Sequence, residues 1–462
     1  MIDFRMRWPL AALAVAAALA GCASAAIDEN FTSVQRFSQQ RLGADLRWLT
    51  SDEARRQAQA DVDALLAQPL GPDDATRIAL AYSPALQALL FEGAASAAAV
   101  TQSARLPNPV FAFERLVRNE AGARELELTR SLSFSVLDLL LWPARQRLAD
   151  YQQQAARLTL ASNVVQAASD ARVAWINAVA AQQSLQYAEQ VKAAADASAE
   201  LARRMQAAGN FSKLQRAREQ AFSADAVAQL ARAQQVARSS REVLVRALGL
   251  SDAQAAHLTL QERLPELPAS PREEPAVAKE ALDQRLDVQL ARGSLEHIAR
   301  EQGLTRITSV VNGLELGVVR KSEMGLAPQK GYQLELPLPI FDFGDASRAR
   351  AQANYMAALQ RTAQVAVEAQ SQLRESYGIY RSAYDIARHY RDEIVPLRKT
   401  ISDENLLRYN GMLIGVFELL ADAREQIASV AQSIDAQRDF WLADARLQAT
   451  LIGQPMMKET TP

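Results

Sequence analysis

The sequence predicts a mainly α-helical protein with a small β part and an internal duplication. Long alanine-rich stretches run without a helix breaker, and residues 144–208 contain neither proline nor glycine. Apolar and polar residues alternate in four short segments, which is the pattern of β-strands. Similar residues recur in the same order at an offset of roughly 200 residues, a period far longer than that of solenoid repeats.

The N-terminus has the features of an export signal, which predicts a lipoprotein signal peptide over residues 1–21. Two arginines precede an apolar run, Trp8 to Ala20, which is shorter than the ~20 residues that span a bilayer. The run ends at Leu19-Ala20-Gly21-Cys22, which resembles the lipobox of bacterial lipoproteins, so we expect Cys22 to carry the lipid. An ordinary secretory signal with an incidental cysteine is the alternative, but Cys22 is the only cysteine of the chain. By the same resemblance, Ala23 favours an anchor in the outer membrane.

Composition excludes several classes of function. With 51 basic and 53 acidic side chains, the net charge of −2 offers no basic field for nucleic acid. The three histidines, His257, His297 and His389, lie far apart without the spacing of metal ligands. The sequence contains no glycine-rich phosphate loop and no nucleophile elbow. We therefore expect no enzymatic activity, no cofactor and no metal site.

The recurring residues divide the rest of the chain into two similar parts. Asp138 followed by Arg145-Gln146-Arg147 corresponds to Asp342 followed by Arg348-Ala349-Arg350. Arg218-Glu219-Gln220 corresponds to Arg424-Glu425-Gln426, with a shift of one helical turn. Chance similarity between alanine-rich helices is the alternative, but the aspartate anchors lie outside the repetitive stretches. The predicted organisation is an anchor or linker segment (22–72), a first repeat (73–250), a proline-rich linker (251–275), a second repeat (276–453) and a C-terminal tail (454–462).

In the first repeat, the pattern predicts helix, strand pair, long helix, turn and helix. Asp73 or Asp74 would cap a helix that reaches Ser103, and Pro84 would either kink it or mark a late start. Pro107-Asn108-Pro109 ends this helix. The remaining elements are strands Val110–Leu116 and Glu125–Ser135, a helix from Pro143, which suits a first helical turn, to Ala208, and a helix Ser212–Leu248.

The second repeat predicts the same order of elements. They are a helix Val277–Gly303, strands Ile307–Arg320 and Gly331–Phe341, a helix Asp345–Arg408 that Pro396 would kink, and a helix Val416–Ile452. A half-buried sheet of a soluble protein would alternate in the same way, but the strand lengths match the ~9–11 residues of a tilted membrane strand.

Geometry then predicts how these elements assemble. The helix from Pro143 to Ala208 would be roughly 100 Å long, and the two shorter helices of the same repeat would stack end to end beside it. Four strands cannot close a barrel, and open edges are not tolerated in lipid. Two chains would supply ~8 strands and three chains ~12, and a trimer would leave a wider interior. We therefore expect a long antiparallel α-helical tunnel and a transmembrane β-barrel completed by trimerisation.

Two motifs are similar to those of a known family. Leu336-Pro337-Leu338-Pro339-Ile340-Phe341-Asp342-Phe343-Gly344 leads into an arginine-containing helix, and Tyr409-Asn410-Gly411 leads on to Leu420-Ala421-Asp422-Ala423. With this order of elements from about Asp73 to Gly453, the chain resembles the TolC-like outer-membrane efflux and secretion channels. The resemblance implies a homotrimer with its barrel in outer-membrane lipid and its tunnel in the periplasm. It further implies a passive, gated channel that meets a periplasmic adaptor and an inner-membrane pump, in a tripartite efflux or type I secretion system.

The resemblance also places candidate site residues at the helix turns, which would form the tip of the tunnel and contact the adaptor. Gly209 and Gly411 mark the two turns, where a left-handed C-cap favours glycine. The candidate constriction consists of Tyr409, Leu413, Val416, Phe417 and Glu418, with a ring of carboxylates from Glu418 and an apolar part that closes by dewetting. Glu418 could instead be a solvated helix residue. Ile414 and Gln215 replace charged residues of the family, so no charge-paired lock is expected there.

A periplasmic adaptor lipoprotein with helical hairpins is the main alternative, because such proteins also combine long helices with a lipid. It would need a lipoyl-like region flanking a single hairpin, whereas the sequence predicts two hairpins. A soluble coiled coil would leave the four alternating segments unexplained. The transported substrate is not readable from the sequence.

Overall fold

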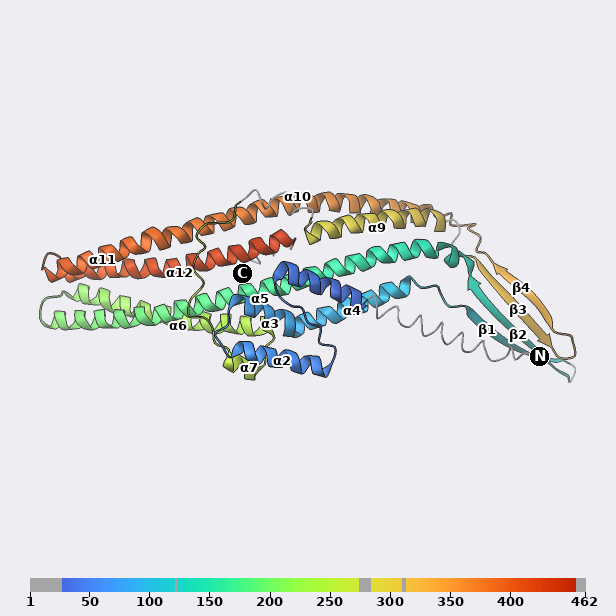
Figure 1. Cartoon of the computed structure of the whole chain (residues 1–462), viewed down its shortest axis with the longest axis horizontal. Coiled ribbons are helices and arrows are strands. Elements are labelled where there is room, and N and C mark those ends of the chain that lie inside the picture. The colour runs from blue at the N-terminus through green and yellow to red at the C-terminus, as the bar shows by residue number, and fades with distance from the viewer. Residues whose placement is uncertain (1–26, 121–122, 274–283, 310–312, 454–462) are drawn as a thin grey trace. The chain divides into compact units, whose positions relative to one another are not determined.

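The computed structural model describes residues 27–120, 123–273, 284–309 and 313–453 (Figure 1). Two compact units share the chain. We call Met1–Ser33, Phe91–Thr159 and Val288–Ala366 the sheet unit, and Val34–Leu90, Leu160–Asp287 and Val367–Pro462 the hairpin unit. Cys22 and the predicted signal peptide lie outside the described residues.

The predicted fold class is confirmed, since long helices dominate and one small antiparallel sheet is present. The elements of the first half are a helix over residues 27–42, α2 (Asp52–Leu66), α3 (Pro72–Tyr82), α4 (Pro84–Ser103), β1 (Val110–Glu120), β2 (Ala123–Ser135), α5 (Val136–Ala207), α6 (Lys213–Leu248) and α7 (Asp252–His257). Those of the second half are α9 (Leu286–Thr308), β3 (Glu315–Glu323), β4 (Gln329–Glu335), α10 (Asp345–His389), the π-helix η1 (Tyr390–Ile394), α11 (Val395–Asn410) and α12 (Val416–Ile452). The internal duplication stays a prediction.

Three predicted helices differ from the observed ones at prolines. The helix Asp73–Ser103 is broken at Ser83, because Pro84 disfavours a helical conformation in the residue before it. The long helix of the first half starts at Val136, so Pro143 lies inside it and not in its first turn. The Ser135 hydroxyl accepts a hydrogen bond from the Asp138 N–H at 3.2 Å and supports this earlier start. In the second half, η1 interrupts the long helix directly before Pro396.

The strand predictions were right in number and in error at several ends. β1 continues to Glu120, beyond the predicted Leu116. The predicted strand Ile307–Arg320 was wrong in its first part, because α9 extends to Thr308 and β3 begins at Glu315. β4 ends at Glu335, before the predicted Phe341, since Pro337 and Pro339 have no N–H to donate to a neighbouring strand. Of the predicted helix Val277–Gly303, residues 277–283 lie outside the described part.

The sheet unit contains one antiparallel sheet in the order β1-β2-β3-β4. The strand pairs of the two halves meet through β2 and β3, where Ser131 lies opposite Val319 (Figure 1). The sheet is followed by a tight turn at Gly344, whose φ is 73° and whose added Cβ would lie 2.4 Å from the Ser309 carbonyl oxygen. The Asp342 carboxylate accepts the Gly344 N–H at 2.7 Å. These contacts explain why the motif before α10 ends in Asp-Phe-Gly.

Segments read from the sequence as linkers form part of the core of the hairpin unit. Leu70 is fully buried, and its N–H donates to the Thr259 carbonyl oxygen at 2.8 Å. The Trp175 indole N–H donates to the Leu70 carbonyl oxygen at 2.8 Å. Further along, the Trp441 indole N–H donates to the Pro265 carbonyl oxygen, also at 2.8 Å. The proline-rich linker is therefore held against the helices by aromatic side chains.

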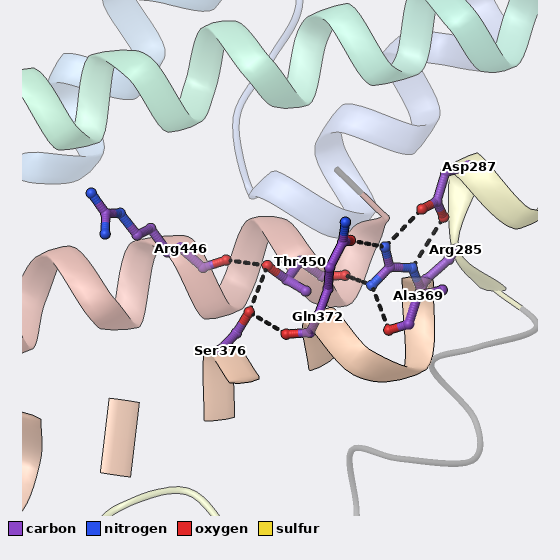
Figure 2. A network of polar contacts seen from close by, with 7 residues as sticks. All are labelled: Arg285, Asp287, Ala369, Gln372, Ser376, Arg446 and Thr450. Carbon is purple, nitrogen blue, oxygen red and sulfur yellow. Dashed lines mark hydrogen bonds and ion pairs between the residues drawn. The ribbon is translucent and has the colours of Figure 1, made fainter. Parts of the chain in front are cut away.

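Arg285, directly before α9, is fully buried and joins three elements of the hairpin unit (Figure 2). Its guanidinium forms two hydrogen bonds with the Asp287 carboxylate, at 3.0 and 2.7 Å. It also donates to the Thr450 carbonyl oxygen in α12 at 2.9 Å and to the Gln372 side chain in α10 at 3.1 Å. The Thr450 carbonyl oxygen also accepts the Gly453 N–H at 3.1 Å, so Arg285 adds a second donor at the C-terminal end of α12.

Among the described helices, none alone is long and apolar enough to cross a membrane. Only α3 and α4 together, bent by 45° at their junction, pass that test by length and composition.

The buried carboxyl of Asp444 should make the stability of the hairpin unit depend on pH. Burial raises the pKa of this carboxyl, while Arg272, 3.3 Å away, and Gln448 oppose the shift. A carboxyl whose pKa rises on folding favours the folded state at low pH, and this contribution is lost as the pH rises above the unfolded pKa. The stability of Asp444→Asn relative to that of the wild type should therefore be higher at pH 7 than at pH 4. Thermal unfolding at both pH values measures this, with the exposed Asp439→Asn as control, and the opposite trend would contradict it.

Candidate functional site

The first hairpin tip joins α5 to α6 through a turn that the sequence predicted. Gly209 has a φ of 80°, the left-handed conformation expected of a glycine after a helix. The N–H groups of Asn210 and Phe211 both donate to the Met205 carbonyl oxygen. Ser212 and Gln215 then form a capping box at the start of α6, which gives Gln215 a local role.

The second hairpin tip, between α11 and α12, departs from the prediction. Gly411 has a φ of −79° and is not left-handed, so the predicted reason for a glycine at this position was wrong. The left-handed residue is Met412, with a φ of 60°. A non-glycine residue in this region is uncommon and strained. Met412 and Leu413 are 93% and 77% exposed, so this turn presents apolar side chains to the surroundings.

A hydrophobic cluster joins the two tips within the hairpin unit. Its buried members are Ala202, Phe211 and Val416, with Met205, Tyr409, Phe417 and Leu420 packed against them. The rings of Phe211 and Phe417 are stacked with their centroids 4.9 Å apart. This stacking adds about 0.5–1.5 kcal/mol to the energy of burial.

The cluster divides the predicted constriction residues into two groups. Tyr409, Val416 and Phe417 pack inside the chain, against the first hairpin tip. Leu413 and Glu418 are exposed and are the members of the set whose side chains are free to meet another molecule.

A buried ion pair lies behind the tip cluster. Arg424 of α12 approaches the Glu219 carboxylate of α6 to 2.6 Å, and Glu219 is 1% exposed. The Ser198 hydroxyl of α5 donates to the same carboxylate at 2.6 Å. The Arg424 guanidinium carbon also lies 4.4 Å from the centre of the Phe222 ring, within cation–π range. Glu219 and Arg424 each belong to one of the two Arg-Glu-Gln triplets noted in the sequence.

The two faces of the sheet differ in chemistry. Directly paired residues of an antiparallel sheet lie on the same face, so the registers assign the strand residues to one of two faces, which we call face A and face B. Face A carries Phe111, Phe113, Arg115, Val117, Leu126, Leu128, Arg130, Leu132, Phe134, Leu316, Val318, Arg320, Ser322, Lys330, Tyr332 and Leu334. Face B carries mainly polar residues, among them Glu127, Thr129, Ser131, Ser133, Lys321 and Gln333, together with the apolar Val110, Ala112, Leu116 and Val319.

In the two central strands, the apolar face is more exposed than the polar face. Most apolar residues of face A are exposed, with Val318 at 63%, Tyr332 at 86% and Leu334 at 62%. Except for Glu125, the face B residues of β2 and the central residues of β3 are partly or fully covered, whereas β4 and residues 110–119 of β1 are exposed on both faces. A contiguous exposed apolar face of this kind marks a site of contact with another protein or with a membrane.

The fold is similar to that of several solved outer-membrane channels. The CmeC channel of Campylobacter jejuni aligns with a TM-score of 0.72 at 13% identity, covering 84% of this chain and 87% of that one. VceC of Vibrio cholerae aligns at 0.67 and 16% identity, covering 86% and 98%, and MtrE of Neisseria gonorrhoeae, in its open state, at 0.68 and 16%, covering 82% and 88%. No family model and no curated protein matches the sequence. The chain therefore has the TolC-like fold, as its motifs predicted.

Proposed function

We propose that three copies of this chain form a passive channel through the outer membrane. The observation that carries the proposal is the exposed apolar face A on a sheet whose other face is mainly polar. Four strands leave two open edges, which three copies would close into a barrel of ~12 strands with face A toward lipid and face B toward the interior. The TolC-like fold supports this arrangement.

We further propose that the hairpin tips connect the channel to a periplasmic adaptor and its inner-membrane pump, in an efflux or type I secretion system. The exposed apolar Met412 and Leu413, held on a strained turn beside Gly411, offer a contact surface there. The lipid on Cys22 would be an auxiliary anchor in the outer membrane, since the strands would cross the bilayer themselves. The channel itself would catalyse no reaction.

Matched charge insertions on the two faces test the membrane orientation of the sheet. Phe134 and Leu334 belong to one row of face A, and Ser133 and Gln333 to the adjacent row of face B. A lysine on the lipid side costs about 2–4 kcal/mol near the bilayer middle, whereas a lysine in the lumen costs little. We expect Phe134→Lys/Leu334→Lys to abolish the heat-modifiable trimer in membrane fractions, and Ser133→Lys/Gln333→Lys to retain it.

Planar-bilayer recordings of the same proteins provide the second readout. The wild type and the face B variant are expected to conduct, and the face A variant is not. Equal insertion of both double variants would contradict the assigned orientation, and absence of conductance from the wild type would contradict the channel itself.

The two exposed constriction residues give a second test of the channel. In a trimer, Leu413 would form an apolar ring that loses water, and Glu418 a ring of carboxylates that repel one another. We expect Leu413→Ala and Glu418→Ala to raise single-channel conductance about twofold or more, because each removes a constriction. Glu404→Ala, an exposed acid on α11, is the control and should leave conductance unchanged. If neither Leu413→Ala nor Glu418→Ala alters conductance, the constriction lies elsewhere.

A further inference from the structure

A row of basic side chains crosses the apolar face A. Arg130 of β2 lies directly opposite Arg320 of β3, which in turn lies opposite Lys330 of β4. We call these three residues the basic row. Arg115 of β1 lies in the next row of face A toward the strand turns, opposite Leu128. All four side chains are exposed.

The basic row is unfavourable without a bound anion. Side chains directly opposite each other in an antiparallel sheet lie about 5 Å apart at Cβ, and like charges there are destabilising. Within the described residues, none of the three forms an ion pair, and face A carries no carboxylate. Face B contrasts with this, because Lys321 contacts Glu127 at 2.6 Å and Glu323 at 3.1 Å. The chain therefore neutralises the cations of face B and leaves those of face A without a counter-charge.

Two apolar rows lie next to the basic row on its side nearer the helices. The first consists of Leu132, Val318 and Tyr332, and the second of Phe134, Leu316 and Leu334. At about 3.4 Å per residue, they lie roughly 7 and 14 Å along the strands from the cations. On the side nearer the helices, face A thus presents positive charge next to an apolar surface, which is the complement of an amphiphile with an anionic head and apolar chains. On the other side, toward the β1–β2 turn, it carries Arg115 together with Val117, Leu126 and Leu128.

The free-energy cost of a charge next to lipid limits the depth in the bilayer at which these cations can lie. Charges on lipid-facing strand positions are most unfavourable at the bilayer middle and nearly neutral at its surface. Lys330 is the second residue of β4, close to the β3–β4 turn. Arg130 and Arg320 lie nearer the middle of β2 and β3. The basic row is least unfavourable at the headgroup level, with Tyr332 at the aromatic boundary beside it, and the β1–β2 hairpin, which continues for seven residues beyond Arg130, would then extend past the lipid.

We propose that the basic row binds the phosphate groups of an anionic membrane lipid, whose acyl chains lie along the two apolar rows. This inference rests on the proposed function, since it requires face A to contact lipid. Arginine and lysine provide the charge-assisted hydrogen bonds that phosphate oxygens accept. A free phosphate ion would use the cations only, whereas the adjoining apolar rows match a lipid.

The test uses the full-length protein, reconstituted in phosphatidylcholine nanodiscs that contain a small fraction of lipid A as the phosphate-bearing probe. Native mass spectrometry counts the lipid A molecules that stay bound after delipidation. The variant is Arg130→Gln/Arg320→Gln/Lys330→Gln. The control, Lys213→Gln/Arg232→Gln/Arg238→Gln, removes three exposed cations from α6 and changes the net charge equally.

We expect the variant to retain at least tenfold less lipid A than the wild type and the control, which should behave alike. Monophosphoryl lipid A should bind more weakly, and inorganic phosphate in the buffer should not displace either lipid. Equal retention by variant and wild type, or displacement by inorganic phosphate, overturns the lipid site while leaving the channel proposal intact if conductance is normal. Failure of the wild type to insert overturns both.

Discussion

Arg285→Ala is expected to lower the free energy of unfolding of the hairpin unit by about 3 kcal/mol or more. The side chain is fully buried, and its loss leaves the Asp287 carboxylate, the Thr450 carbonyl oxygen and the Gln372 side chain without their shared donor. Unsatisfied buried polar groups cost more than the hydrogen bonds had contributed. Arg285→Lys should also destabilise, because an ammonium group cannot reproduce the two parallel bonds to Asp287.

Denaturant unfolding followed by circular dichroism measures the effect in detergent solution. Arg374→Ala is the matched control, because Arg374 is an exposed arginine of the neighbouring α10. Its effect should stay within about 0.5 kcal/mol. If Arg285→Ala were no more destabilising than Arg374→Ala, the network would not stabilise the unit.

The second large effect is expected from Arg424→Met. This change leaves the Glu219 carboxylate buried with only the Ser198 hydroxyl as partner, and removal of one member of a buried pair costs about 3–5 kcal/mol. We expect the two hairpins to loosen behind the tip cluster, with faster hydrogen exchange in α6 and α12. Arg398→Met is the control, since its ion pair with Glu425 at 3.1 Å is exposed and worth at most about 1 kcal/mol.

A double variant distinguishes the contribution of the charge pair to stability from that of the packing around it. Glu219→Leu/Arg424→Leu removes both charges together and should recover most of the stability, because apolar pairs replace buried ion pairs at little cost. If Arg424→Met exchanged no faster than Arg398→Met, the buried pair would not hold the hairpins together.

The sequence predicted those elements whose ends carry local signals. The bounds of α12, Val416 to Ile452, were right because glycines stand at both of its ends. The start of α6 was predicted to within one residue, since it begins at Lys213 with the predicted first residue, Ser212, as its cap. The strands were recognised because alternation is visible without tertiary information. The start of β3 was missed because residues before Glu315 have similar apolar content in a helix or a strand.

The candidate site was predicted less completely, because it depends on contacts between hairpins. Alanine-rich helices show no clear apolar stripe, so nothing in the local pattern indicated that Phe417 would stack on Phe211. The left-handed conformation of Met412 could not be predicted either, since the neighbouring Gly411 is the residue type that usually adopts it. Glu219 and Arg424 stood in the repeated triplets, but only the packed hairpins bring them together.

The order of strands in the sheet has a consequence for biogenesis. Each outer ladder, β1 with β2 and β3 with β4, joins neighbours in sequence, whereas the central ladder joins Ser131 to Val319, roughly 190 residues later. Contacts of such high sequence separation form slowly, because the entropy of loop closure must be overcome first. Two separate hairpins with exposed apolar faces should therefore exist during synthesis until the intervening helices have folded. During that interval we expect these hairpins to be prone to aggregation.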